Sequence, residues 1–244
     1  MLKMKKLLPL LPMLFLAGCY NAPSTTIVEK PRAVGRANGV DLATDAGQVA
    51  HRLKDTGLHF VARYYRKPDS RWPTLSANEA KLISSLGLNL VTVWESHSRH
   101  PSYFTYSRGY YDAASAYNQA KTIGQPPNSA IYFAVDFDAR GADVIPVDQY
   151  FRGVHAGLAA AAGQVREYRV GVYGSGAVCD YLKRTRLAEY AWLSNSTAWS
   201  GYDSFTDWNI KQSGRSPLLS FDQDSNEARG EFGSFQVPTQ YSSL

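Results

Sequence analysis

Ala130-Ile131-Tyr132-Phe133-Ala134-Val135-Asp136-Phe137-Asp138 is an apolar run that ends in two carboxylates. Such a run predicts a strand buried on both faces, as in a parallel sheet, and the carboxyl ends of these strands carry the active sites of barrels. Because side chains alternate along a strand, Asp136 and Asp138 are expected on one face, roughly 7 Å apart. Two acids this close disfavour each other's ionisation. The pair therefore indicates catalysis or ligand binding, with capping of a following turn as the alternative.

Strand-like and helix-like segments alternate on both sides of this run. Five predicted strands lie at 39–42, 59–64, 89–95, 130–138 and 169–173, and the helices that follow them lie at 45–55, 77–86, 110–122, 146–162 and 177–184. Three further strands, at 190–194, 208–212 and 218–222, are separated by gaps too short for full helices. The alternation predicts parallel strands joined by right-handed crossovers, and eight strands close a barrel. We therefore expect an α/β fold, a TIM-type barrel with helices mainly after the first five strands.

The N-terminus has the composition of a secretory signal. Lys3, Lys5 and Lys6 precede an apolar stretch at 7–16, which is too short to span a bilayer as a helix. These three lysines account for three of the five net positive charges, which leaves +2 for the rest of the chain. Since no cluster of Lys and Arg remains, nucleic-acid binding is not expected.

The end of this signal, Leu16-Ala17-Gly18-Cys19, resembles the bacterial lipobox, in which the cysteine becomes the lipidated first residue of the mature protein. We expect a lipoprotein signal peptide at 1–18, a flexible tether at 19–36 and a barrel domain at 37–244. Acyl chains on Cys19 would anchor the exported protein in the cell envelope, on the periplasmic side of a bacterial membrane. A soluble secreted protein is the alternative.

Cys179 is the other cysteine of the chain, so lipidation of Cys19 would exclude an intramolecular disulfide. A lone cysteine is most often a buried, inert side chain. A catalytic thiol, which requires a nearby base and a lowered pKa, is the alternative.

Polar and aromatic side chains gather at the C-terminal ends of the predicted strands, which meet at one mouth of a barrel. The acids there are Asp41, Glu95, Asp136, Asp138 and Asp222. The candidates for substrate binding are Arg63, Tyr65, Glu95, Tyr173, Trp192, Ser194 and Gln212. Aromatic rings beside polar groups are suited to stacking on sugars, so this mouth predicts a carbohydrate site.

Structural roles remain open for several of these residues. Asp41 could instead cap a helix, Arg63 could form a structural ion pair, and Asp222 could open a turn. Glu95, His97 and His100 form a Glu-x-His-x-x-His pattern that lacks the helical spacing of zinc hydrolases. Neither a metal ion nor another cofactor is expected.

Six sequence blocks, in this order along the chain, resemble a bacterial glycoside-hydrolase-like domain of unknown function. They are Gly39-Val40-Asp41, Phe60-Val61-Ala62-Arg63-Tyr64, Tyr132-Phe133-Ala134-Val135-Asp136-Phe137-Asp138, Gly171-Val172-Tyr173-Gly174, Trp192-Leu193-Ser194 with Ala198-Trp199, and Asp222-Gln223. That domain is similar to the family 25 glycoside hydrolases, the lysozymes that cut peptidoglycan between N-acetylmuramic acid and N-acetylglucosamine. The resemblance extends from residue 37 to the C-terminus.

This resemblance implies a muramidase-like hydrolase of an acetamido-sugar polymer such as peptidoglycan. The family carries an Asp-x-Glu motif on its fourth strand, with the Glu as the proposed general acid. Carried over by position, Asp138 takes the acid role and Asp136 the stabilising role, with Asp41 and Asp222 as further catalytic acids. Asp138 departs from the motif because it is one methylene shorter than Glu. A catalytically weak or inactive carbohydrate-binding barrel is therefore the alternative.

Overall fold

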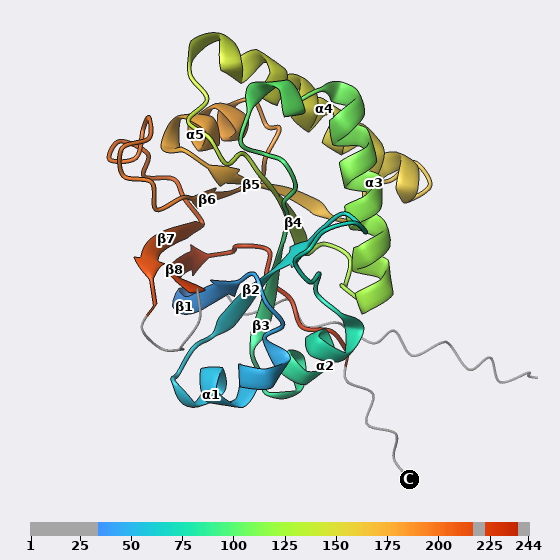
Figure 1. Ribbon diagram of the computed structural model, residues 1–244, viewed down its shortest axis with the longest axis vertical. Helices are drawn as coiled ribbons and strands as arrows, with labels where there is room; N and C mark the ends of the chain where they lie inside the picture. The colour runs from blue at the N-terminus through green and yellow to red at the C-terminus, as the bar shows by residue number, and fades with distance from the viewer. Residues whose placement is uncertain (1–33, 217–222, 239–244) are drawn as a thin grey trace, which may run out of the picture. The chain divides into compact units, whose positions relative to one another are not determined.

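The computed structural model describes residues 34–216 and 223–238, in which eight strands form a closed barrel in chain order (Figure 1). The strands are β1 Val34–Leu42, β2 Phe60–Tyr65, β3 Asn89–Trp94, β4 Ala130–Ala134, β5 Arg169–Gly174, β6 Tyr190–Leu193, β7 Ile210–Arg215 and β8 Gln223–Gly230. The α-helices are α1 Ala50–Asp55, α2 Ala77–Ser85, α3 Tyr106–Ile123, α4 Val144–Ala161 and α5 Gly176–Arg184. The predicted α/β barrel, with helices after the first five strands, is confirmed.

The eighth strand runs against the direction that we expected. Strands β1 to β7 are parallel to their neighbours in chain order, whereas β8 is antiparallel to both β7 and β1. Asp41, near the end of β1, pairs with Asp224, near the start of β8. The start of β8 therefore lies at the mouth, and the expectation that this strand ends there is wrong. Asp222 and the predicted strand 218–222 lie outside the described residues.

Alternation along the strands separates two apolar layers. On β2, Phe60 and Ala62 fill the barrel interior, whereas Val61 and Tyr65 pack in the layer between barrel and helices. Cys179 lies in this outer layer, where burial raises the pKa of its thiol and keeps it protonated. A side chain near the end of a strand therefore reaches the mouth only if it lies on the face of the strand that points into the barrel.

Helices α3 and α4 lie side by side along the barrel, and their backbones approach each other at glycines (Figure 1). A Cβ atom at Gly153 of α4 would collide with the carbonyl oxygen of Tyr106 on α3. We predict that Gly153→Ala lowers the free energy of unfolding by about 1–3 kcal/mol, although Ala favours helix more than Gly does. Urea unfolding measures this loss. Gly35→Ala, where a Cβ meets no atom within 4 Å, is the matched control, and equal stability of the two variants would contradict the prediction.

Every helix in the described part of the chain is too short or too polar to cross a lipid bilayer.

Candidate active site

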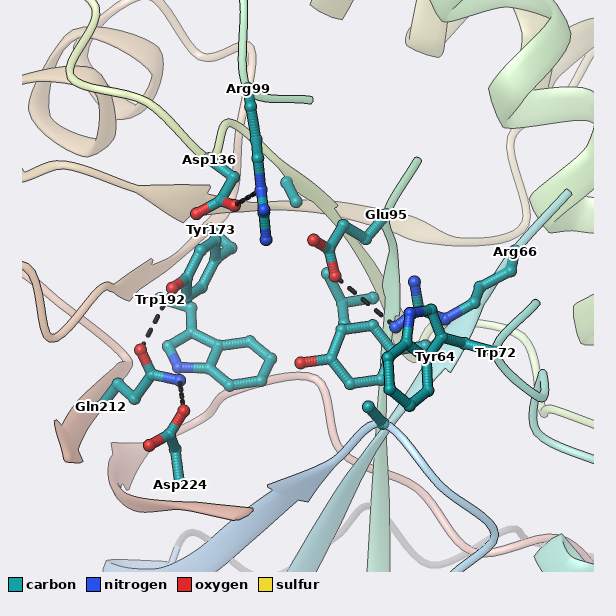
Figure 2. Close-up of a pocket in the computed structure, with 13 residues that line it drawn as sticks. Tyr64, Arg66, Trp72, Glu95, Arg99, Asp136, Tyr173, Trp192, Gln212 and Asp224 are labelled. Atoms are coloured by element: carbon teal, nitrogen blue, oxygen red, sulfur yellow. Dashed lines mark hydrogen bonds and ion pairs between the residues drawn. The ribbon is translucent and has the colours of Figure 1, made fainter. Parts of the chain in front are cut away.

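A pocket of about 320 Å³ opens at the mouth where the parallel strands end (Figure 2). Its charged lining residues are Arg66, Glu95, Arg99, Asp136 and Asp224. Its aromatic lining residues are Tyr64, Trp72, Tyr173 and Trp192, and Gln212 lines it as well. The structure thus brings five of the predicted site residues to this pocket: Glu95, Asp136, Tyr173, Trp192 and Gln212.

Gln212 on β7 links three elements of the site. Its amide nitrogen donates to Asp41 Oδ2 (3.1 Å) and to Asp224 Oδ2 (3.2 Å), and its carbonyl oxygen accepts from the Tyr173 hydroxyl (3.1 Å). The same oxygen accepts from the backbone N–H of Asn195 at 3.2 Å. Because the Tyr173 proton points to Gln212, the tyrosine oxygen offers a lone pair to a ligand.

Asp41 lies buried behind this glutamine and accepts three hydrogen bonds. The donors are the Tyr64 hydroxyl (2.9 Å), the Gln212 amide and the Asn226 amide (2.8 Å). Burial raises the pKa of Asp41 from 3.8 to about 6, in spite of these hydrogen bonds. Trp192 is held from the same side, since its indole N–H donates to Asn226 Oδ1 at 2.9 Å.

The pKa of Asp41 predicts how stability depends on pH. A carboxyl whose pKa is higher in the folded state than in the unfolded state favours folding only while it is protonated. Its contribution to the free energy of unfolding should therefore fall by about 3 kcal/mol as the pH rises from about 4 to about 6. Carbon-13 NMR titration of the Asp41 carboxyl should show a midpoint near pH 6. A midpoint at its ordinary pKa of 3.8 would contradict this prediction.

Glu95 and Asp136 face the pocket with separate counter-ions. Glu95 follows β3, and its Oε2 lies 3.7 Å from Arg66 Nη2; Asp136 follows β4, and its Oδ2 accepts from Arg99 Nε at 2.8 Å. Their side chains are 19% and 22% exposed. Burial raises both pKa values, while the arginines oppose this effect. The charge of Asp136 raises the pKa of Glu95 further.

The Tyr173 hydroxyl lies close enough to the acids of the mouth for their charges to change its pKa. Burial raises the pKa of Tyr173, and the charges of Asp136, Asp41, Glu95 and Asp224 raise it further. Four carboxylates from four separate segments of the chain thus act on one hydroxyl group. Acids that are scattered along the chain are gathered around a single cavity.

Arg63 and Tyr65 do not reach the pocket. Both are fully buried on the outer face of β2, where Arg63 Nε donates to Glu79 Oε1 at 2.5 Å and the Tyr65 hydroxyl donates to Gln125 Oε1 at 2.6 Å. The expectation that they bind substrate is wrong because they lie on the face that packs against the helices. Tyr64, between them, lines the pocket instead.

Asp138 and Ser194 also lie outside the pocket lining. Strand β4 ends at Ala134, and the carboxylate of Asp138 accepts from the backbone N–H of Ser200 (2.9 Å) and from Arg140 Nε (2.6 Å). Burial alone would raise the pKa of Asp138, but these hydrogen bonds hold it below its ordinary value. Ser194 is buried, and its hydroxyl accepts from the backbone N–H of Ser196.

Five charged or aromatic residues of the pocket lining were not predicted: Tyr64, Arg66, Trp72, Arg99 and Asp224. Alternation along β2 would have identified Tyr64. Asp224 lines the pocket because β8 is antiparallel to its neighbours and begins at the mouth. The other three lie in loops, where no periodic signal exists. Across 34–216 and 223–238, no three His, Cys, Asp or Glu side chains are grouped so that they could hold a metal ion.

The barrel and its acidic mouth define a glycoside-hydrolase-like protein. The model of the Rv2525c-like, glycoside hydrolase-like domain matches residues 51–239, so the chain belongs to this family. The resemblance read from the sequence is confirmed.

Four known proteins are similar to this chain, two in sequence and two in fold. The uncharacterized proteins FadG and YbfG of Bacillus subtilis (strain 168) are 33% identical over 159 residues and 29% identical over 189 residues, which is 62% and 72% of this chain. The matches cover 27% of FadG and 26% of YbfG, so the chain spans about a quarter of these relatives. The Tat-secreted protein Rv2525c of Mycobacterium tuberculosis is 20% identical, with a TM-score of 0.67 over 81% of this chain and 98% of Rv2525c. A family 25 glycosyl hydrolase from Bacillus anthracis is 13% identical, with a TM-score of 0.51 over 84% of this chain and 95% of that one. Rv2525c and this glycosyl hydrolase therefore share the barrel fold of the present chain.

Proposed function

We propose that this protein binds an acetamido-sugar polymer in the mouth of its barrel and hydrolyses a glycosidic bond there, with peptidoglycan as the expected polymer. One observation carries the proposal: Glu95 and Asp136 face a single pocket that is also lined by aromatic rings. A pair of carboxyl groups and rings that stack on sugars are the parts that glycoside hydrolysis requires.

Glu95 is the group best placed to donate a proton. Its burial raises the pKa of its carboxyl, and its arginine partner is 3.7 Å away, a distance that leaves the carboxyl accessible to a ligand. Because a raised pKa keeps more of the carboxyl group protonated at a given pH, Glu95 is suited to protonate the leaving oxygen of a glycosidic bond.

Asp136 supports the other side of the reaction. Arg99 donates to it at 2.8 Å, which fixes its carboxylate at the pocket wall. From there it would orient the 2-acetamido group or a water molecule that attacks the anomeric carbon. The bond from this carbon to the leaving oxygen breaks as the attacking oxygen bonds to the carbon and Glu95 gives its proton to the leaving oxygen. Where the acetamido oxygen attacks first, a water molecule then replaces it on the anomeric carbon. The water gives one proton to a carboxylate of the site, Glu95 or Asp136, and leaves its hydroxyl group on the sugar.

This assignment moves the acid role away from Asp138. Its lowered pKa and its bonds to Arg140 and Ser200 make Asp138 a poor proton donor and suit it to holding the loop at Ser200. The proposed enzyme therefore keeps two acids at the mouth without using the second Asp of the motif.

The test is release of new reducing ends from purified peptidoglycan and from chitin-type oligosaccharides over a wide pH range. Release from either polymer supports hydrolysis. Absence of both binding and release would overturn the proposed function.

The second candidate function is a carbohydrate-binding barrel without turnover. The position of Asp138 favours it, because the residue that takes the general-acid position by the resemblance to family 25 is bonded away from the pocket. Binding of glycan without release of reducing ends at any pH would select this function.

We also propose export and lipid anchoring through Cys19, which lies with residues 1–18 outside the described part of the chain. The lipobox-like Leu16-Ala17-Gly18-Cys19 supports this proposal, and Rv2525c is described as Tat-secreted. In a bacterial host, Cys19→Ser should abolish incorporation of labelled palmitate and move the protein out of the membrane fraction, because acyl chains would be its membrane attachment. Cys179→Ser is the control. Membrane association that survives Cys19→Ser would contradict the anchor.

A further inference from the structure

Trp72 differs from the other aromatic residues that line the pocket. Its side chain is 44% exposed, whereas Trp192 is 1% exposed and Tyr64 and Tyr173 are half-buried. It lies in the loop between β2 and α2, at the rim. The guanidinium of Arg71 lies over this ring, 5.5 Å from its centroid, and the exposed part of the indole offers a flat apolar surface at the edge of a polar pocket.

The loop that carries Trp72 is fixed at both ends by one side chain of α3. The carbonyl oxygen of Gln119 accepts from the backbone N–H of Arg66 (3.1 Å) and from the Thr74 hydroxyl (2.7 Å), and its amide nitrogen donates to the carbonyl oxygen of Arg66 (2.6 Å). Within the loop, the backbone N–H of Trp72 donates to Ser70 Oγ at 3.1 Å. The backbone that carries the indole is therefore held in place before a ligand arrives, which lowers the entropic cost of binding.

Trp72 lies on a defined side of the pocket. Figure 2 shows it beside Tyr64 and Arg66, across the pocket from Gln212 and Asp224. The guanidinium of Arg66 lies over the Tyr64 ring, 4.3 Å from its centroid, and its Nη2 reaches toward Glu95. The row from Glu95 through Arg66 to Trp72 thus leads from the proposed proton donor to the rim.

The size of the pocket indicates what this rim does. A volume of about 320 Å³ lies at the lower end of the range for ligand pockets, so the pocket holds about one sugar ring. Any further ring of a polymer must continue over the rim. We propose that Trp72 is the stacking platform of a second sugar subsite, so that the protein recognises a chain of sugars and not a single ring. This inference rests on the proposed function.

Binding measurements on glycan fragments of two lengths test the inference. Wild type is expected to bind the repeating disaccharide of peptidoglycan glycan strands about fivefold more tightly than N-acetylglucosamine alone, because the second ring stacks on the indole and this stacking contributes about 1 kcal/mol. Trp72→Ala should remove this gain. Trp72→Phe should keep most of it, and Gln119→Leu should lose part of it because the loop is no longer fixed. Tyr111→Ala, which removes an exposed aromatic residue outside the pocket lining, is the control.

Each outcome has a distinct meaning. A gain with length that persists in Trp72→Ala would overturn the second subsite, as would equal affinity of wild type for the two fragments, and the proposed function would stand in both cases. Binding of neither fragment by wild type would overturn the proposed function together with this inference.

Discussion

Glu95→Gln and Asp136→Asn are each expected to lower the rate of glycan hydrolysis by roughly 100- to 10,000-fold. Removal of a general acid has an effect of this size, and Asp136 acts on the same reacting centre. Glutamine keeps the shape of Glu95 but has no acidic proton to give, and asparagine cannot supply the negative charge that Arg99 now holds in place. Reducing-end release from peptidoglycan, at saturating substrate, measures the rate.

Asp138→Asn distinguishes the two assignments of the general acid, which are Glu95 and Asp138. Because Asp138 lies outside the pocket lining and is bonded to Arg140 and Ser200, its replacement should lower the rate far less than either change at the mouth. Asp203→Asn, at an exposed acid, is the control for a change of charge alone. If Asp138→Asn reduces the rate as strongly as Glu95→Gln does, Asp138 is the general acid and our assignment is wrong.

The same variants predict a change in pH dependence. If Glu95 donates the proton, activity should fall as the pH rises through its raised pKa, because the charged form has no proton to give. Glu95→Gln should remove this alkaline limb from the residual rate.

Arg63→Met is expected to lower the free energy of unfolding by about 3–5 kcal/mol, because it leaves Glu79 as an uncompensated buried charge. Both side chains of this ion pair are at most 1% exposed. Glu79 also accepts from the backbone N–H of Ala46 and caps α2 together with Ser76, so the pair joins β2, α2 and the loop after β1. Urea unfolding measures the loss.

The exposed ion pair between Arg184 and Asp180 is the matched control for Arg63. Arg184→Met should change the free energy of unfolding by less than about 1 kcal/mol, since both partners are in contact with water. A loss below about 1 kcal/mol in Arg63→Met would show that the buried pair is not what holds these elements together. Partial recovery in the double variant Arg63→Met/Glu79→Leu is expected, because no charge is then left buried.

The sequence was sufficient to predict the barrel because β2 to β6 are short, mainly apolar runs and each of the first five strands is followed by a helix. The sequence did not show, however, which face of β2 points into the barrel. Both faces of this strand carry apolar or aromatic residues, and Arg63, the charged one, forms an ion pair with Glu79. Arg63 looked like a ligand-binding residue, but its partner Glu79 is sixteen residues away in another element. Only the alternation of Phe60 and Ala62 on the inner face identifies Tyr64 as the residue at the mouth.

The acids of the site were predicted in part for a similar reason. Glu95 and Asp136 each follow the last inward-facing residue of a strand by two positions, Val93 and Ala134, and so continue the inner face. Asp138 would continue it as well if β4 were longer, but the chain turns where the backbone N–H of Ala139 donates to the carbonyl oxygen of Phe137. Asp224 depends on the reversed direction of β8, and Trp72 depends on a loop held by Gln119. Neither signal is present in local sequence.

The most direct test of the whole account is a structure of the protein with a peptidoglycan glycan fragment bound. We predict that a glycosidic oxygen lies within hydrogen-bond distance of Glu95, and that the acetamido group of the same sugar lies beside Asp136. A fragment bound at the mouth with its glycosidic oxygen on Asp138, or a fragment bound away from the barrel mouth, would contradict the account.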